Sequence, residues 1–299
     1  MHMGSVAFTP TNTRLSTFAV AVALVILSAG CARPPPPPPI STWGYQLATV
    51  DLDDLRRSPH DLLVIDSLGR RGPLAPTDLK SLRASGRVVL GYLSVGEAEE
   101  YRFYWDPTWR EAPPRWLDEE NPQWPRNFAV RFWKAGWQDV LRRQVDLLIG
   151  QGFDGMYLDG VDAWEHWSGP DRPQSVRRAQ ALMVATVLRL TAYARSKKPG
   201  FWVIPQNSTE LLMRDDYLRA INGAASENVF YDDHGQDQRS AITRPILRHL
   251  ERVIALGKPA MVVEYIRPEL FPEFRKRARA HNLIPYATVR SLDVLMPPL

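Results

Sequence analysis

The segment Gly152–Asp162 reads GFDGMYLDGVD and places two acids directly after a short apolar run. An apolar run of this length between glycines is typical of a buried parallel strand rather than of an amphipathic helix. Asp159 stands where this strand would leave its sheet, and Asp162 follows it closely. An acid that ends a buried strand is a poor core residue and a good active-site residue. We therefore expect this strand to be the fourth of an eight-stranded barrel, with Asp159 at the reaction centre.

Polar residues also end most of the other predicted strands. These residues are Tyr45, Asp66, Glu97, Gln206, Glu227 and Glu264. In a (β/α)8 barrel the carboxyl ends of the strands converge on one mouth, where active sites are built. Acids outnumber bases at this predicted mouth, although the whole protein has a formal net charge of +4. An acidic mouth suits a cationic ligand, a metal ion or an oxocarbenium-like transition state.

Several other chemistries lack their sequence signatures. The histidines form neither an HxH nor an HExxH pattern, and a single cysteine excludes a cysteine-ligated zinc site within the chain. A Ca²⁺ or Mg²⁺ site made only of carboxylates stays open. The sequence has no GxSxG elbow of a serine hydrolase, and no phosphate-binding signature of a flavin or nicotinamide enzyme is evident. No Lys/Arg block indicates nucleic-acid binding. We expect no cofactor and no resident metal.

Paired carboxylates and aromatic platforms favour a sugar substrate. Glycosidases use one carboxylate as nucleophile or base and another as acid, and sugar rings pack their apolar C–H faces on tryptophan and tyrosine. A long insertion from about residue 101 to residue 131 is rich in aromatic residues, and loops of this length are uncommon unless they carry function. We expect one or two of four tryptophans in and beside it to stack on sugar, and the rest to pack the protein: Trp105, Trp124, Trp133 and Trp137.

The elements that must position these residues read as one (β/α)8 barrel, an α/β fold, over residues 42–299. Apolar runs predict strands at residues 43–47, 62–65, 88–95, 153–158, 201–204, 217–225, 260–263 and 284–289. Helical patterns fall at residues 77–85, 137–149, 175–196, 239–256 and 268–281. Strands that alternate with helices at this spacing indicate parallel pairing, and about 260 residues fit one closed barrel.

Residues 1–31 are predicted to be a signal peptide with a lipobox-like end. Arg14 precedes a short apolar run, and small residues lead to the single cysteine, Cys31. We expect Cys31 to be acylated, with plain secretion as the alternative. The proline-rich residues 32–41 predict a stiff polyproline II spacer. The protein is therefore expected to be secreted or lipid-anchored to the bacterial cell envelope, with a lipid anchor as its link to the membrane.

The sequence resembles the glycoside hydrolase family 114 domain, the endo-α-1,4-polygalactosaminidase group, from residue 43 to about residue 289. The matching segments are WGYQL, VVLGYLSVGEAE, NFAVRFWKAGW, GFDGMYLDGVD, IPQNSTELL, SENVFYDD and VVEY. The resemblance implies a (β/α)8 barrel that cleaves α-1,4 links in partly deacetylated galactosamine polymers. It also implies an aspartate after the fourth strand, Asp159, and a glutamate after the sixth, Glu227. By analogy with related α-glycosidase barrels, these would be the nucleophile and the acid/base of a retaining mechanism.

The expected substrate contacts surround this pair. They are Tyr45, Asp66, Tyr92, Glu97, Glu99, Trp124, Asp162, Gln206, Asn207, Tyr231 and Glu264. One of the acids at positions 66, 97 and 99 is expected only to pair with an arginine. Asp162 has helix capping as an alternative role, and Glu210 is a rival for the acid/base. Two other functions stay open: a non-catalytic carbohydrate-binding barrel lipoprotein, and a hydrolase of a different α-glycoside.

Overall fold

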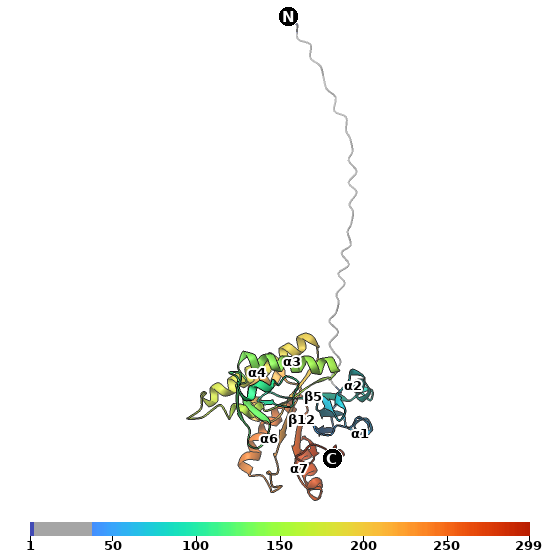
Figure 1. Ribbon diagram of the computed structural model, residues 1–299. Helices are drawn as coiled ribbons and strands as arrows, with labels where there is room; N and C mark the ends of the chain where they lie inside the picture. Colours follow the sequence, from blue (N-terminus) through green and yellow to red (C-terminus); the bar gives the residue numbers. More distant parts are fainter. Residues whose placement is uncertain (3–37) are drawn as a thin grey trace. The chain divides into compact units, whose positions relative to one another are not determined.

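The structure, a computed structural model, describes residues 1–2 and 38–299, and the barrel lies within the compact unit Pro37–Leu299 (Figure 1). The predicted signal peptide, Cys31 and most of the proline-rich linker lie outside the described residues. Within the described ranges, no helix is both long enough and apolar enough to cross a membrane.

Eight parallel strands form the centre of the fold, and seven of them lie close to their predicted positions. They are β1 (Trp43–Gln46), β2 (Leu62–Ile65), β5 (Val88–Ser94), β9 (Gly155–Asp159), β10 (Trp202–Pro205), β11 (Ala224–Glu227), β12 (Ala260–Glu264) and β13 (Ile284–Ala287). The sixth is predicted at residues 217–225, but the helix α5 (Asp215–Ala220) takes up the first part of that stretch and the strand β11 begins only at Ala224. The eight strands pair in chain order, as a five-stranded sheet β1-β2-β5-β9-β10 and a three-stranded sheet β11-β12-β13. A parallel bridge between Gln206 and Ala225 joins the two sheets at β10 and β11. Where β1 and β13 meet, the Trp43 indole N–H donates to the Ile284 carbonyl oxygen at 3.0 Å.

Side chains from all eight strands pack into one buried cluster, to which no helix in the described part of the chain contributes. Its strand members are Trp43, Tyr45, Leu62, Val64, Val88, Leu90, Tyr157, Trp202, Ile204, Ala225, Met261, Val263 and Tyr286. They recur at every second position of their strands, as side chains on one face of a pleated strand must. The strands therefore surround a filled interior, which is the arrangement of a (β/α)8 barrel and confirms the predicted fold.

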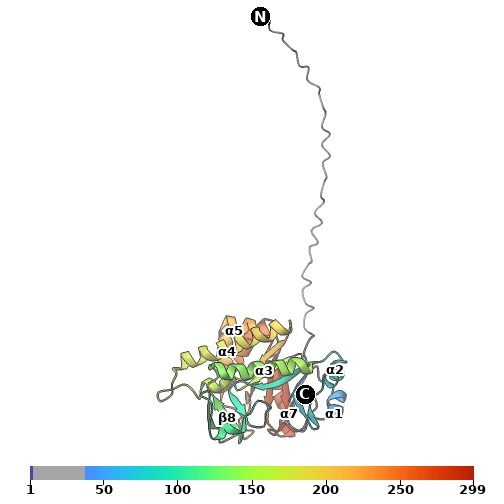
Figure 2. The same cartoon turned by 45° about the horizontal axis from the view of Figure 1, so that its top comes forward.

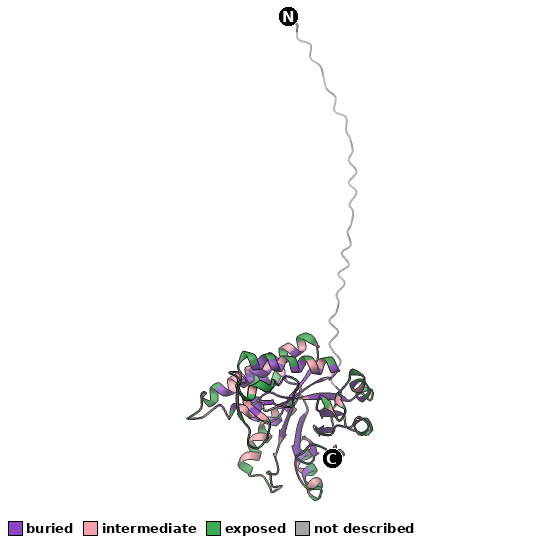
Figure 3. Cartoon of the chain, in the orientation of Figure 1, coloured by how far each residue is buried: buried purple, intermediate pink, exposed green. Residues whose placement is uncertain are grey.

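The helices cover the outer faces of the strands. They are α1 (Leu52–Arg57), α2 (Pro76–Arg83), α3 (Ala135–Gln151), α4 (Val176–Lys197), α5 (Asp215–Ala220), α6 (Ser240–Ala255) and α7 (Phe271–Ala280), with short 3-10 turns η1 (Pro107–Arg110), η2 (Val161–Trp164), η3 (Thr209–Met213) and η4 (Pro268–Leu270). Figure 2 shows α3 and α4 side by side, and Figure 3 shows that the strands between the helices are buried. The alternate strand residues, such as Leu63, Val89 and Val203, pack in a second cluster with helix residues.

The start of β9 is fixed by the end of α3. Gly152 has a left-handed backbone (φ 96°), and its N–H bonds the carbonyl oxygens of Leu148 and Ile149. Glycine adopts this conformation without the steric cost of a Cβ atom, which is why it commonly ends helices. The chain therefore turns at once into the strand that carries Asp159.

The predicted insertion is a small sheet rather than a bare loop. Strands β6 (Glu97–Glu99), β7 (Leu117–Glu120) and β8 (Asn127–Val130) pair antiparallel in the order β6-β8-β7. We call residues 97–131 the inserted sheet. Its base is a chain of aromatic contacts: Trp105–Trp109, Trp109–Trp116 and Trp116–Trp137 have ring centroids 5.2, 4.9 and 5.1 Å apart. Because Trp137 belongs to α3, this stack fastens the inserted sheet to the barrel wall.

Candidate active site

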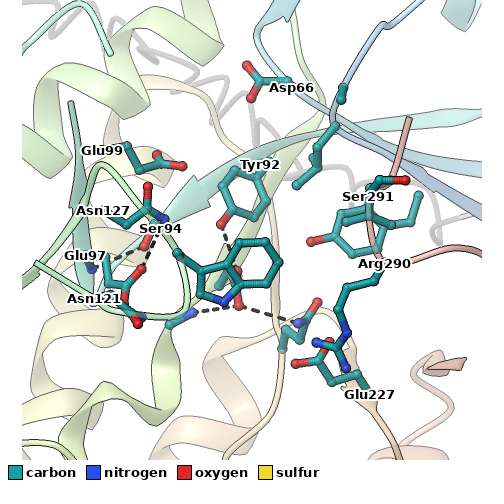
Figure 4. A pocket seen from close by; sticks show the side chains of 18 of the residues that line it. Asp66, Tyr92, Ser94, Glu97, Glu99, Asn121, Asn127, Glu227, Arg290 and Ser291 are labelled. Carbon is teal, nitrogen blue, oxygen red and sulfur yellow. Dashed lines mark hydrogen bonds between the residues drawn. The ribbon is translucent and has the colours of Figure 1, made fainter. Parts of the chain in front are cut away.

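One pocket of about 500 Å³ lies at the carboxyl ends of the strands. Its lining includes both predicted catalytic residues and nine of the eleven predicted substrate contacts: Tyr45, Asp66, Tyr92, Glu97, Glu99, Trp124, Asp162, Gln206 and Asn207. Figure 4 shows Glu97, Asn121 and Asn127 on one side of this pocket and Glu227 with Arg290 on the other. Several lining residues, including Asp159 and Glu227, come two positions after a residue of the interior cluster on the same strand. Because side chains two positions apart point to the same side of a strand, these residues also face the barrel interior. They form its polar layer at the carboxyl ends of the strands.

Asp159 is held by three donors from three parts of the chain. The Tyr92 hydroxyl donates to Oδ2 at 2.7 Å, and the Gly160 N–H donates to Oδ1 at 2.8 Å. The Gln206 amide lies 3.4 Å from Oδ1, and its own oxygen accepts from the Tyr157 hydroxyl at 2.6 Å. That last bond fixes the amide with its NH₂ group toward Asp159, so the carboxylate has a defined orientation.

Glu227 is held from two sides at the end of β11. The Asn207 amide donates to Oε1 at 3.0 Å and also reaches Asp162 Oδ2 at 3.2 Å. The Tyr265 hydroxyl donates to Oε2 at 2.8 Å. The Glu227 N–H donates back to Asn207 Oδ1 at 3.1 Å, so the orientation of this amide is also fixed. Asn207 has a left-handed backbone (φ 64°), a local strain of the kind found at functional sites.

The carboxylates of the pocket interact with one another. Burial, followed by the charges of Glu227 and Asp162, raises the pKa of Asp159 to about 7. Burial and Glu227 raise the pKa of Asp162 to about 6. The charge of Glu227 therefore contributes to the raised pKa values of both aspartates. A cation that enters the pocket favours their ionised forms.

Two glycines let the Asp159 loop and the inserted sheet meet. A Cβ atom at Gly96 would overlap the Gly160 carbonyl group and the Ala163 side chain. Gly160 itself has φ 66°, and its own Cβ position lies 3.0 Å from the Gly96 nitrogen. The Val95 N–H also donates to the Asp159 carbonyl oxygen at 2.9 Å. The segments that carry Glu97 and Asp159 are therefore in direct backbone contact.

Two of the predicted contacts, Asp66 and Glu99, are tied to one buried arginine. Arg102 donates to Asp66 Oδ1 at 2.7 Å and to Glu99 Oε2 at 2.7 Å, and all three side chains are almost inaccessible to solvent. The Tyr101 hydroxyl adds a bond of 2.6 Å to Glu99. The sequence predicted that one acid here pairs with an arginine, whereas the structure pairs two.

Two predicted contacts lie away from the pocket, which corrects their expected placement. Glu264 is fully buried and accepts the N–H groups of Val229 and Phe230 at 2.9 and 2.8 Å, and burial raises its pKa to about 8. Glu264 comes two positions after Val262, whose side chain packs with the helices. Side chains two positions apart on a strand point the same way, so Glu264 also faces the helices rather than the barrel interior. Tyr231 is buried against Arg277, whose guanidinium lies 5.0 Å from the ring centroid.

The pocket also contains residues that sequence reasoning did not select, among them Tyr265, Asn121, Asn127, Arg102 and Arg290. The strand period could have found Tyr265, because it stands two residues after the inward-facing Val263. Of the four singled-out tryptophans, only Trp124 lines the pocket, with 46% of its surface exposed. Trp137 is fully buried, and Trp105 and Trp133 pack against the outer core.

The grouping of the acids bears on the carboxylate-only metal site that the sequence left open. Over the described part of the chain, no three or more His, Cys, Asp or Glu side chains are grouped so that they could hold a metal ion. The oxygens of Asp159 and Glu227 accept instead from tyrosine hydroxyls, side-chain amides and a backbone N–H.

Sequence comparison places the chain beside one enzyme family. The model of glycoside-hydrolase family GH114 matches residues 27–297. An uncharacterized protein of Deinococcus radiodurans is 36% identical over 261 residues, which cover 86% of this chain and 83% of that protein.

Two solved structures share the fold. The glycoside hydrolase domain of PelA from Pseudomonas aeruginosa superposes with a TM-score of 0.67 at 21% identity, over 85% of this chain and 97% of that one. Ega3 of Aspergillus fumigatus, solved in complex with galactosamine, superposes with a TM-score of 0.68 at 16% identity, over 88% of this chain and 97% of that one. At these identities the likeness bears on the fold alone.

Proposed function

The chain belongs to glycoside-hydrolase family GH114, and from that premise we propose that it hydrolyses an α-1,4-linked galactosamine-type polysaccharide, with Asp159 as nucleophile and Glu227 as acid/base. The observation that carries the proposal is the convergence of these two acids in one pocket. They come from the ends of two different strands, each is oriented by a tyrosine hydroxyl, and the charge of Glu227 contributes to the raised pKa of Asp159.

This geometry favours catalysis over the alternative of a non-catalytic carbohydrate-binding barrel. If Asp159 or Glu227 formed a salt bridge with an arginine outside the cleft, the non-catalytic alternative would be favoured. Among the described residues, no Lys or Arg forms a salt bridge with Asp159 or Glu227, whereas Asp66 and Glu99 are paired with Arg102. Neither acid is therefore paired with a cation of the described chain, and both line the pocket that a substrate would enter.

A retaining reaction would use the pair in two steps. In the first step, Asp159 attacks the anomeric carbon while Glu227 gives its proton to the leaving glycosidic oxygen. In the second step, Glu227 takes a proton from water, whose oxygen displaces Asp159 and releases the sugar. This mechanism requires the two carboxyl groups to stand about 5 Å apart.

The charge of the pocket supports a cationic substrate. Its lining holds six acids, Asp66, Glu97, Glu99, Asp159, Asp162 and Glu227, against two arginines, Arg102 and Arg290. With a pKa of about 7, Asp159 carries a proton in part of the molecules at neutral pH, and a nucleophile must be ionised. The ammonium group of a galactosamine unit would lower this pKa by Coulomb attraction. Binding of a charged amino sugar would therefore increase the fraction of Asp159 that is ionised and able to attack.

The predicted signal peptide supports a proposal for the location of the protein. We propose that the protein is secreted, or anchored to the cell envelope through an acylated Cys31. Metabolic labelling with a fatty acid should mark the wild-type protein and not Cys31→Ala. Labelling of both variants, or of neither, would reject the anchor.

The function is tested with purified protein and a panel of α-1,4 polymers: galactosamine, N-acetylgalactosamine and a neutral sugar. We expect reducing ends to appear fastest from polymers with free amines. Asp159→Asn and Glu227→Gln should each lose at least about a thousandfold in kcat, because either change stops one half of the two-carboxylate reaction. Glu210→Gln, outside the pocket lining, is the matched control and should stay near wild type. Near-normal turnover by Asp159→Asn would defeat the assignment.

A further inference from the structure

Glu97 differs from the other acids of the inserted sheet in how it is held. Its oxygens accept from two neutral amides, Asn121 Nδ2 at 2.6 Å and Asn127 Nδ2 at 3.2 Å. Asn121 Oδ1 accepts the N–H of Gln123 at 2.9 Å, which fixes the NH₂ group of this amide toward Glu97. Amide donors orient a carboxylate without neutralising its charge. The arrangement presents an oriented negative charge to the pocket (Figure 4).

Glu99, on the same strand, is held differently, by a cation. Glu99 stands two residues later on β6 and is buried in a salt bridge with Arg102. Glu97 has no Lys or Arg within salt-bridge distance in the part of the chain that the structure describes. A partly buried carboxylate without a cation costs free energy that a neutral glutamine would not. We infer that this charge serves to bind a ligand in the pocket that Glu97 lines.

An aromatic platform lines the pocket from the turn that carries the Glu97 amides. Trp124 lies in the turn between β7 and β8, where its N–H donates to the Asn121 carbonyl oxygen at 3.2 Å and its carbonyl oxygen accepts the Asn127 N–H at 3.0 Å. Nearly half of its surface is exposed, and it lines the same pocket as Glu97. An indole face takes the apolar C–H side of a sugar, and a carboxylate takes an ammonium group. The two together match an amino sugar.

This group belongs to the inserted sheet, whereas the catalytic pair belongs to β9 and β11. Figure 4 shows Glu97 and Glu227 on different sides of the pocket. We propose that Glu97, Asn121, Asn127 and Trp124 form a separate subsite, which binds the ammonium group of a second amino sugar away from the bond that is cut. This inference rests on the proposed function, and it makes Glu97 a specificity-determining residue rather than a catalytic one.

The test compares Glu97→Gln with Glu119→Gln, which removes the same charge from the inserted sheet at an exposed position outside the pocket lining. Three substrates are used: a galactosamine tetramer, its N-acetylated form and a nitrophenyl α-galactosaminide that is too short to reach a second sugar site. We expect Glu97→Gln to lower kcat/KM on the galactosamine tetramer at least about tenfold, mainly through KM, because a charge-assisted hydrogen bond is lost. Its activity on the nitrophenyl substrate should stay within about twofold.

A double variant separates lost charge from lost structure. In Glu97→Gln the new NH₂ group would meet the Asn127 amide donor, whereas adding Asn127→Asp supplies an acceptor and returns the negative charge. We expect Glu97→Gln/Asn127→Asp to recover much of the preference for the free amine. Equal losses on the tetramer and the nitrophenyl substrate, or a Glu97→Gln variant that matches Glu119→Gln, would overturn the subsite.

Failure of the proposed function would be recognised separately. If the wild-type protein cleaves none of the three substrates, calorimetric titration with the galactosamine tetramer still tests the subsite. Binding by the wild type that weakens at least about tenfold in Glu97→Gln, with Glu119→Gln unchanged, would support it. Equal affinities of the three proteins, or no binding by the wild type, would reject it.

Discussion

Asp159, the proposed nucleophile, lies in an environment that opposes its ionisation. Three donors hold its oxygens, yet burial and two neighbouring acids raise its pKa to about 7. The unfolded chain would give it an ordinary value near 4. Keeping this group in the pocket therefore lowers the stability of the empty protein at neutral and alkaline pH.

The sign of this effect gives a prediction. Because the pKa of Asp159 is higher in the folded than in the unfolded protein, this group contributes to stability when the pH lies below its unfolded-state pKa. The contribution is lost as the pH rises from about 4 through about 7. At pH 8 the free energy of unfolding of Asp159→Asn should therefore exceed that of the wild type by roughly 1–3 kcal/mol, and its melting temperature should be higher. At pH 4 the two proteins should differ little. Thermal melts at both pH values check this. A variant less stable than the wild type at pH 8 would contradict the raised pKa.

Arg102 gives a second prediction at the residue scale. Arg102→Met would leave Asp66 and Glu99 buried without their cation, and breaking a buried pair in this way costs about 3–5 kcal/mol. Denaturant unfolding should show this loss. The triple variant Asp66→Asn/Glu99→Gln/Arg102→Met should recover a large part of it, because no uncompensated charge remains. Arg110→Met, which breaks an exposed pair with Glu100, should cost far less.

At the scale of elements, the period of the strands explains what the sequence could predict. Asp159 and Glu227 both end strands on the inward parity, so their meeting in one pocket follows from the barrel alone. Glu264 also ends a strand, but one position out of phase, and it supports the loop after β11 instead. Counting in twos from Met261 and Val263 would have selected Tyr265 and excluded Glu264.

The inserted sheet could not be predicted in the same way. Its strands are short, and β7 carries three consecutive acids where an alternating pattern would be needed. Asn127 reaches Glu97 across the antiparallel register of β6 and β8, and Asn121 reaches it from the turn that joins β7 to β8. That register depends on packing against the barrel, including the contact between Trp116 and Trp137, which local sequence does not encode.

The contact between Gly96 and Gly160 gives a prediction at this scale. Gly96→Ala would push the Asp159 loop away from the inserted sheet, because the new methyl group meets the Gly160 backbone and the Ala163 side chain. We expect kcat to fall by about a hundredfold or more, since small displacements of catalytic groups are costly. Gly150→Ala, where a Cβ atom meets nothing, is the control. Wild-type activity in Gly96→Ala would show that the loop has room to move.

At the scale of the whole molecule, the charge of the pocket opposes that of the protein. The chain has a formal net charge of +4, while the pocket lining has an excess of acids. Attraction of the proposed cationic substrate would therefore come from the local field of the mouth, which salt screens beyond about 10 Å at 0.1 M ionic strength.

A salt titration measures this local field. Raising the ionic strength from about 0.02 to 0.3 M should lower kcat/KM on a galactosamine polymer severalfold and leave a neutral or N-acetylated substrate almost unchanged. Glu97→Gln should reduce the slope for the charged polymer. An equal response of charged and neutral substrates would show that the acids of the mouth do not guide binding.

The inserted sheet occupies one uninterrupted stretch between β5 and α3, whereas the acids at the ends of β9 and β11 are encoded downstream of it. Under the proposed function and the proposed subsite, a gene with this layout would keep polymer choice and bond cleavage in separable blocks. Recombination could exchange the segment that encodes residues 97–131. Gly96 would have to be kept, and the exchanged segment would need an arginine that still pairs with Asp66. The proposed catalytic acids on β9 and β11 would not change. A mutant library confined to that block is consequently the economical place to look for enzymes with new polymer preferences.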